Sequence, residues 1–305
     1  MNRGIGLLVV ATILWGGNYL CGRYLSDALP STLLNTTRWG ISTLILLALL
    51  SYNNKKLPIF KMWKEYAILG FTGIFAFSTL TYLALDNIGV SQAGMISSGI
   101  PISILVFTPF ILKEKISVKA WVGAGISIVG VIILFLGKSG ELAIETSLLG
   151  NFQVVLACLA WGIYTVIGKR YGKLHDSLTL TAGAALYGTV FSAISCIGTV
   201  EPSMVSMTGT VWMSLLYVST FASVGAYLAW NAGVKIVGAS QAAPYLNLLP
   251  VWTVLFGIIF LKEQISFLAW IGGAITIMGA VLASVDKEFF HSLIKRKIEN
   301  KPKMM

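Results

Sequence analysis

Residues 112–121 read LKEKISVKAW, and residues 261–270 read LKEQISFLAW. The two stretches lie 149 positions apart, and 17 of 48 residues are identical when 89–136 is aligned without gaps to 238–285. The identical pairs include Gln92 with Gln241, Pro101 with Pro250, Lys113 with Lys262 and Trp121 with Trp270. Apolar composition alone does not produce such pairs at one offset, so the chain contains an internal repeat.

A second, weaker match links the beginning of the chain to its middle. ATILWGGNYLCGRYL at 11–25 aligns with ACLAWGIYTVIGKRY at 157–171, and Trp15 then corresponds to Trp161 at an offset of 146. Together the two matches indicate that the first half of the chain is duplicated in the second half.

The composition predicts an integral membrane protein. Of the 305 residues 56% are hydrophobic and 11% are charged, and the mean hydropathy is +0.81. Soluble domains carry about 25% charged residues. Apolar runs of the length that a helix needs to cross a bilayer recur along the chain, and each must be helical because lipid offers no partner for backbone N–H and C=O groups. The ten expected spans are 4–24, 32–52, 66–86, 90–112, 119–137, 149–169, 177–199, 209–233, 239–261 and 267–285.

The positive charges predict the orientation. With the N-terminus inside, 18 of the 22 Lys and Arg residues fall in inner segments, including the basic tail 287–305. The even number of spans then places the C-terminus inside as well. This distribution accounts for the formal charge of +10 without a nucleic-acid partner, since the cations are spread over loops.

The first apolar run, 4–24, resembles a signal peptide because a positive charge precedes it. It lacks a small-residue cleavage site, so we expect a retained helix.

Five spans in each copy imply an inverted repeat. Because five is odd, the second copy begins on the other side of the membrane, and a pseudo-two-fold axis in the membrane plane relates the halves. We therefore expect an all-α integral membrane protein of ten transmembrane helices in two inverted five-helix repeats. The expected boundaries are 1–140 and 141–286 for the repeats and 287–305 for the cytoplasmic tail.

This layout carries a family resemblance. The repeat, the WGGNY stretch at 15–19 and the paired SQA…P…LKE stretches resemble the drug/metabolite transporter superfamily, specifically its EamA-type ten-helix exporters. The resemblance implies export of amino acids or related small metabolites across a bacterial inner membrane by alternating access. The implied partners are a small-molecule solute and the lipid bilayer, and the sequence carries no signature of an oligomeric state.

Polar and aromatic side chains within the spans are the candidate cavity lining, because in lipid they must face protein or water. Near span ends, aromatic residues also fit interfacial anchors. The expected lining residues are Trp15, Asn18, Tyr19, Tyr82, Ser97, Trp161, Tyr164, Tyr227, Trp230, Gln241, Tyr245 and Asn247. Such a lining suits neutral, zwitterionic or partly apolar solutes, with aromatic faces for cationic groups.

Three further residues in the spans have two interpretations each. Pro101 and Pro250 occupy equivalent mid-span positions, which fits either a hinge beside the cavity or a fixed kink. Arg38 lies several residues inside the second span, where it either extends to the outer surface or contacts a substrate carboxylate. Its counterpart at offset 146 is Ala184, so the charge is not a scaffold requirement of both halves.

Catalysis and cofactor binding are not expected. His175 and His291 lie in a loop and in the tail, so no base accompanies a nucleophile within the spans. The three cysteines are far apart and form no metal-ligand pattern, and no metal or cofactor is predicted. The alternative function that stays open is a lipid or lipid-linked-sugar flippase.

Overall fold

The computed structural model of the chain describes residues 2–26, 28–85, 87–88, 90–139, 147–197, 205–261 and 266–284. These residues form helices and short connections, with no β-strand among them. Seven apolar helices in this part of the chain have 18 or more residues, and three shorter apolar helices accompany them. They coincide with the ten expected spans, so the prediction of a ten-helix membrane protein is confirmed.

The first half follows the predicted order with two interruptions. The third span contains a π-helical segment, and the fourth is broken just before Pro101. Its elements are α1 (Asn2–Ser26), α2 (Ser31–Tyr52), α3 (Trp63–Gly70), η1 (Phe71–Ala76), α4 (Phe77–Leu85), α5 (Val90–Ser97), α6 (Ile100–Leu112) and α7 (Val118–Ser139).

The second half repeats this order and both interruptions. The π-helical segment η3 overlaps the positions that correspond to η1 at an offset of 149, and a 3-10 segment precedes Pro250. Its elements are α8 (Leu148–Gly172), α9 (Ser177–Cys196), α10 (Gly209–Tyr217), η3 (Val218–Gly225), α11 (Ala226–Val237), α12 (Ala239–Ala242), η4 (Ala243–Asn247), α13 (Leu248–Leu261) and α14 (Phe267–Ser284).

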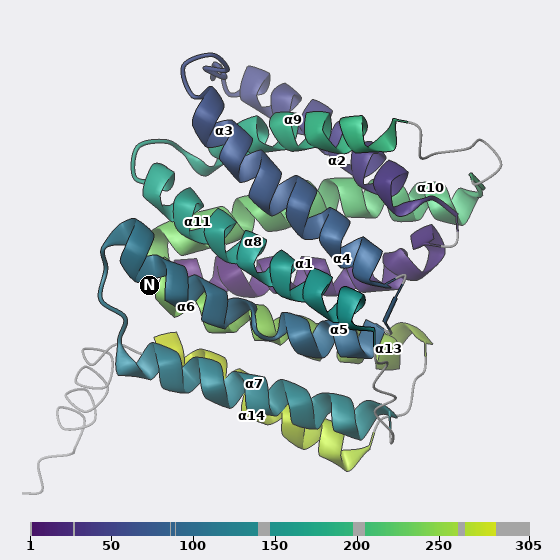
Figure 1. Cartoon of the computed structure of the whole chain (residues 1–305), viewed down its shortest axis with the longest axis vertical. Coiled ribbons are helices and arrows are strands. Elements are labelled where there is room, and N and C mark those ends of the chain that lie inside the picture. The colour runs from purple at the N-terminus through teal and green to yellow at the C-terminus, as the bar shows by residue number, and fades with distance from the viewer. Residues whose placement is uncertain are drawn as a thin grey trace, which may run out of the picture.

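The connections alternate between two ends of the molecule (Figure 1). At the end where α1 begins, Lys55 Nζ lies 3.0 Å from Asp176 Oδ1, which joins the α2–α3 loop to the N-terminus of α9. Lys173 Nζ lies 3.5 Å from Glu114 Oε1 at the same end. At the opposite end Ser206 N donates to Ala28 O. Successive spans are therefore antiparallel, and the second half runs inverted relative to the first.

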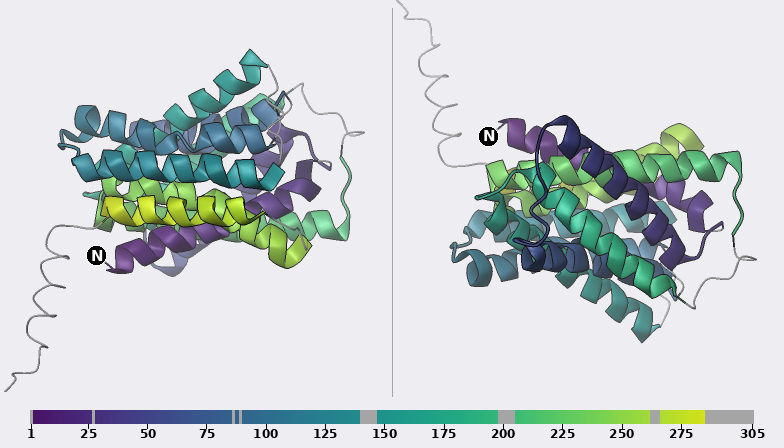
Figure 2. Two further views of the ribbon diagram at one scale, coloured as in Figure 1. Left: turned by 90° about the horizontal axis from the view of Figure 1, so that it is seen from below. Right: turned by 90° about the horizontal axis from the view of Figure 1, so that it is seen from above.

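The packing of the helices follows the pseudo-two-fold axis. Two helix pairs, α2 with α9 and α7 with α14, consist of equivalent helices, and both pairs are in close contact. The remaining main contacts occur in equivalent sets: α1 packs on α11 as α8 packs on α4, and α1 packs on α13 as α8 packs on α6. Figure 2 shows α7 and α14 side by side along one edge of the molecule.

Equivalent residues meet on this axis. Thr43 Oγ1 on α2 lies 3.0 Å from Thr189 Oγ1 on α9, and the two residues are 146 positions apart, which is the offset of the weaker sequence match. The rings of Trp15 and Trp161, also 146 positions apart, meet with centroids 5.3 Å apart. The axis therefore passes close to both contacts.

Small residues form the contact between α7 and α14. A Cβ at Gly123 would lie 2.7 Å from the carbonyl oxygen of Gly279, and a Cβ at Gly130 would lie 2.8 Å from that of Gly272. Backbones at this separation leave no room for a side chain. The glycine spacing that the sequence shows in both copies is thus required by helix packing.

Candidate functional site

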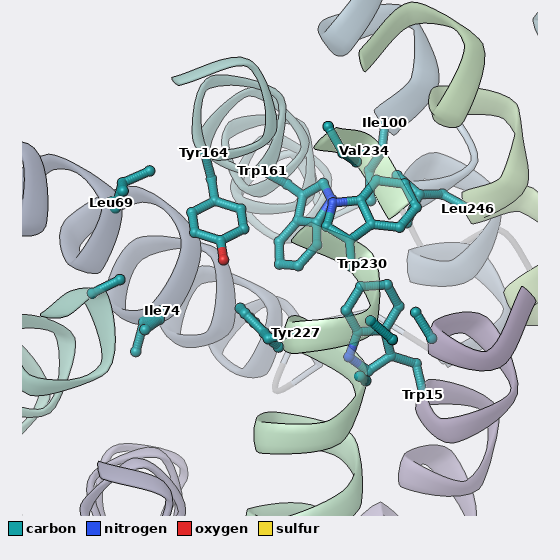
Figure 3. Close-up of a cluster of buried hydrophobic side chains, with 14 of the residues drawn as sticks. Trp15, Leu69, Ile74, Ile100, Trp161, Tyr164, Tyr227, Trp230, Val234 and Leu246 are labelled. Carbon is teal, nitrogen blue, oxygen red and sulfur yellow. The ribbon is translucent and has the colours of Figure 1, made fainter. Parts of the chain in front are cut away.

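Seven aromatic side chains gather where the two halves meet, and we call this group the aromatic centre. It contains Trp15 on α1, Trp39 on α2, Phe77 on α4, Trp161 and Tyr164 on α8, and Tyr227 and Trp230 on α11. Spacings of three residues place Trp161 with Tyr164, and Tyr227 with Trp230, on one face of their helices. Figure 3 shows Trp15, Trp161, Tyr164, Tyr227 and Trp230 converging from three helices.

The rings form a continuous contact network around Trp161 and Tyr227. Their centroids are 5.3 Å apart at an interplanar angle of 83°. Trp39 approaches Tyr227 edge-on at 4.8 Å, and Phe77 lies 4.6 Å from Trp161. T-shaped contacts at these separations are favourable. Six of the seven side chains are buried, with Trp15 the most exposed tryptophan at 8%, and Phe77 is partly buried.

Two hydrogen bonds tie the aromatic centre to the π-helical segments. Trp15 Nε1 donates to the carbonyl oxygen of Ala222 in η3 at 2.9 Å, and Tyr227 Oη donates to that of Gly73 in η1 at 2.8 Å. Gly73 and Ala222 are equivalent positions at an offset of 149. A π-helical turn widens the backbone spacing and interrupts the regular i to i−4 ladder, and such segments are frequent at functional sites. Each half therefore bonds a π-helical carbonyl of the other half.

A polar group adjoins the aromatic centre on α11. Asn231 Nδ2 donates to Tyr164 Oη at 2.8 Å and to Thr181 Oγ1 at 3.0 Å. Trp230 Nε1 makes a longer contact of 3.4 Å with Thr165 Oγ1. These bonds connect α8, α9 and α11 and fix the orientation of the Tyr164 hydroxyl.

Arg38 lies beside the aromatic centre and is 5% exposed. Its Nε donates to Ser223 Oγ in η3 at 2.6 Å, and its Nη1 donates to Tyr82 Oη at 3.3 Å. Its Cζ lies 5.5 Å from the ring of Trp39. The interpretation that Arg38 extends to the outer surface is wrong, because the guanidinium bonds to buried groups between α2, α4 and η3.

The structure brings five of the expected lining residues together: Trp15, Trp161, Tyr164, Tyr227 and Trp230. Tyr82 joins them indirectly through Arg38. The role of each in binding a solute stays a prediction.

The other expected lining residues are not members of the aromatic centre. Asn247 Nδ2 donates to Ser127 Oγ on α7 at 2.7 Å, and Gln241 Oε1 lies near Gly238 at the turn between α11 and α12. Tyr245 is buried in η4. Asn18 and Ser97 are partly buried on α1 and at the end of α5, and the Tyr19 side chain lies outside the described residues.

The two prolines interrupt their spans differently. Pro101 occupies the first turn of α6, after a break at Ser98 and Gly99. Pro250 lies in α13, and Pro244, which has no counterpart in the first copy, begins the 3-10 segment η4. The first turn of a helix accommodates proline because its N–H groups have no helical partner. Both spans thus change geometry just before the shared proline; whether they act as hinges stays a prediction.

The end of the molecule where α1 begins carries one carboxyl with an altered pKa. Partial burial raises the pKa of Asp176, but hydrogen bonds from Lys55 and Thr179 outweigh it and leave the pKa below its ordinary value. Asp176 also caps α9 by accepting from Thr179 N at 3.2 Å. No cluster of three or more His, Cys, Asp or Glu side chains that could hold a metal occurs in the described parts of the chain.

Sequence reasoning missed Trp39 and Phe77 as members of the aromatic centre. Trp39 follows Arg38 directly and is fully buried, and Phe77 begins α4 after the π-helical turn. The one available signal was the adjacency of Trp39 to a charged residue inside a span. Phe77 is an ordinary apolar residue in an apolar span, so its sequence position carried no signal.

Comparisons with known proteins agree with this architecture. The family model described as the EamA-like transporter family matches residues 2–136 and again 148–285. Transporter YyaM of Bacillus subtilis (strain 168) is 26% identical over 282 residues, covering 91% of this chain and 92% of its own length. Transporter YetK of the same organism is 25% identical, with coverages of 92% and 86%. Both are described only as uncharacterized transporters.

Relatives also occur outside bacteria. A transporter from Archaeoglobus fulgidus, likewise uncharacterized, is 24% identical over 289 residues, with 94% of this chain and 99% of its own length covered. A solved crystal structure superposes with a TM-score of 0.80 over 98% of this chain and 100% of its own length, at 20% identity. That likeness shows a shared fold.

Proposed function

The chain belongs to the EamA-like transporter family, and from this premise we propose that it exports amino acids or related small metabolites by alternating access between its two inverted halves. It is a multi-pass membrane transporter. The observation that carries the proposal is the aromatic centre, which lies on the pseudo-two-fold axis and receives side chains from both halves.

The chemistry of the aromatic centre supports an amphipathic organic solute. Tryptophan and tyrosine rings offer apolar contact area and also attract cations to their faces. The hydroxyl of Tyr164 and the indole N–H groups of Trp39 and Trp161, which have no partner among the described residues, add a small number of polar contacts, which is typical of ligand sites. The lining expected from Trp15, Trp161, Tyr164, Tyr227 and Trp230 therefore matches amino acids better than inorganic ions.

The charge distribution supports an inner-membrane location with both termini in the cytoplasm. The end where α1 begins contains Lys55, Lys113, Lys115 and Lys173 in its loops. Positively charged loops favour the cytoplasmic side. The proposed units are two repeats, 1–140 and 141–286, followed by a cytoplasmic tail at 287–305. Labelling of single cysteines in intact cells tests this orientation: Met207→Cys should react from outside and Lys115→Cys should not, and the reverse result would refute it.

Proline gating forms part of the proposal. The breaks before Pro101 and before Pro250 lie at equivalent points of the two halves, which is the arrangement that alternating access requires of a hinge. Replacing both prolines by alanine should slow transport without removing the protein from the membrane. Wild-type transport rates in both single variants would indicate that the breaks are fixed kinks and not hinges.

Transport itself is tested with purified protein in liposomes. Vesicles loaded with unlabelled amino acids should accumulate the labelled amino acid by counterflow, which detects a carrier without knowledge of its coupling ion. Trp15→Ala should abolish counterflow while membrane abundance is maintained. Scrambling of labelled lipid with no solute flux would refute solute transport and indicate that the protein is a lipid flippase.

A further inference from the structure

We infer that Arg38 binds a carboxylate of the transported solute. The inference rests on the proposed transport function and narrows its substrate to molecules that carry a single negative charge at one end. The site comprises Arg38 on α2, its neighbours Tyr82 and Ser223, and the adjoining edge of the aromatic centre at Trp39.

The first observation is a buried charge without a counter-charge among the described residues. Arg38 is the one charged side chain among the described residues that is buried. Its guanidinium is within ion-pair distance of no carboxylate in the same part of the chain. Burying an unpaired charge is strongly unfavourable, and ionisable residues inside membrane spans are accordingly associated with substrate or ion binding.

The second observation is that the hydrogen-bonding capacity of Arg38 is only partly used. An arginine carries five N–H donors arranged as a fork that matches a carboxylate. Described partners accept from two of its nitrogens, Nε and Nη1, and both partners are neutral hydroxyls. Ser223 is itself oriented, since its hydroxyl donates to Val218 O at 2.8 Å. The fork is thus held in place by neutral groups while its charge is left for a ligand.

The third observation is a local surplus of buried donors. Trp39 Nε1 and Trp161 Nε1 are buried and have no hydrogen-bond partner in the described part of the protein. The rings of both residues lie against Tyr227, at 4.8 and 5.3 Å. Buried polar groups are nearly always paired, so unpaired donors indicate a missing acceptor. A carboxylate supplies acceptors.

A buried acceptor without a partner among the described residues lies on the same helix. Asn35, one turn before Arg38 on α2, is fully buried, and its Nδ2 donates to Ser192 Oγ and to Ile74 O. Its Oδ1 has no partner among the described residues. An ammonium group would satisfy this oxygen. A zwitterionic amino acid carries both groups, a carboxylate for Arg38 and an ammonium group for the Asn35 oxygen.

The absence of an equivalent charge argues against a purely structural role. The position equivalent to Arg38 is Ala184 on α9, so the duplicated scaffold folds around a neutral residue there. One positive charge also matches a carboxylate better than a phosphate, which would bring close to two negative charges into the same buried site.

The competing explanation is that Arg38 only anchors η3 through Ser223. Variants of Arg38 and Ser223 distinguish this structural role from binding of the solute. Ser223→Ala removes the hydrogen bond and keeps the charge. Arg38→Met removes both, and Arg38→Lys restores the charge without the fork. Each variant is reconstituted and assayed for flux of the twenty amino acids and of the corresponding amino-acid amides, in which the carboxylate is replaced by a neutral group.

We expect the wild-type protein to transport acids and to discriminate against amides by about 10- to 100-fold in KM, the range for a hydrogen bond to a charged group. Arg38→Met should lose this discrimination, Ser223→Ala should retain more of it than Arg38→Met because the charge is kept, and Arg38→Lys should recover part of it. Equal transport of acids and amides by the wild type, or discrimination that survives Arg38→Met, would overturn the inference while leaving the transport function intact. Lipid scrambling without flux of any solute would instead overturn the transport function.

Discussion

Gly272→Ala on α14 should destabilise the protein, whereas Gly273→Ala, one residue further along, should not. A Cβ at Gly272 would lie 2.6 Å from the Cα of Leu134 and 2.8 Å from the carbonyl oxygen of Gly130, and both atoms belong to the backbone of α7. A Cβ at Gly273 would meet only side-chain atoms, at 3.7 and 3.8 Å, which is ordinary van der Waals contact.

The two substitutions are therefore expected to change the stability of the protein in opposite directions. Both gain about 0.5–1 kcal/mol because alanine is a better helix former than glycine. Gly272→Ala must in addition separate α7 from α14 by roughly 1 Å, because Leu134 N would lie even closer to the new Cβ than the Leu134 Cα and the Gly130 carbonyl oxygen, and overpacking of this kind costs about 1–3 kcal/mol. The net expectation is a loss of about 1–2 kcal/mol at Gly272 and a gain of about 0.5 kcal/mol at Gly273.

Thermal unfolding in one detergent measures this difference directly. With about 2–4 °C per kcal/mol for chains of 150–250 residues, the melting temperature of Gly272→Ala should lie several degrees below that of Gly273→Ala. Gly125→Ala provides the matched control on α7, since no atom lies within 4 Å of a Cβ at that glycine. Equal melting temperatures for the Gly272 and Gly273 variants would refute the close backbone contact between α7 and α14.

Two further predictions concern the centre and the basic end of the molecule. Tyr227→Phe removes the hydrogen bond from the Tyr227 hydroxyl to the Gly73 carbonyl oxygen in η1 and should cost about 1 kcal/mol of stability. The control Tyr24→Phe, at an exposed ring, should leave the melting temperature unchanged. A decrease in melting temperature for Tyr227→Phe no larger than that for Tyr24→Phe would count against the bond. Because the pKa of Asp176 is lowered, the stability from its ionised form is present above its ordinary pKa and is lost as pH falls through the lowered value. Asp176→Asn still caps α9, but the stability of this variant should depend less on pH below about pH 4. At pH 7 the substitution should cost at most about 1 kcal/mol, as expected for an exposed ion pair. The same dependence of stability on acid pH in the variant and the wild type would contradict this prediction.

The repeat in the sequence was sufficient to predict the helices and their inverted order. A shared offset contains this information because equivalent residues occupy equivalent positions about one axis, as Trp15 and Trp161 do. Matching glycines on one face of a span further imply a helix contact.

Side-chain directions could not be predicted in the same way. In a span that is apolar all round, hydrophobic periodicity does not distinguish the face toward lipid from the face toward protein. Asn247 was therefore expected beside the solute, although it bonds to Ser127 on α7. Trp39 was missed for the same reason. The π-helical segments contain no proline, so no local feature of the sequence predicted them.

The contact of Thr43 with Thr189 has a consequence for how the two halves could exchange conformations. Thr43 and Thr189 are equivalent residues on the symmetry axis, so an exchange of conformation between the two halves leaves their contact unchanged. The contact can therefore persist throughout the cycle and serve as a pivot. The bond of Arg38 with Ser223 has no mirror counterpart, because Ala184 cannot form it. In the proposed alternating-access cycle, we therefore expect the two end states to differ in energy, with the empty carrier preferring the state in which Arg38 is bonded to Ser223.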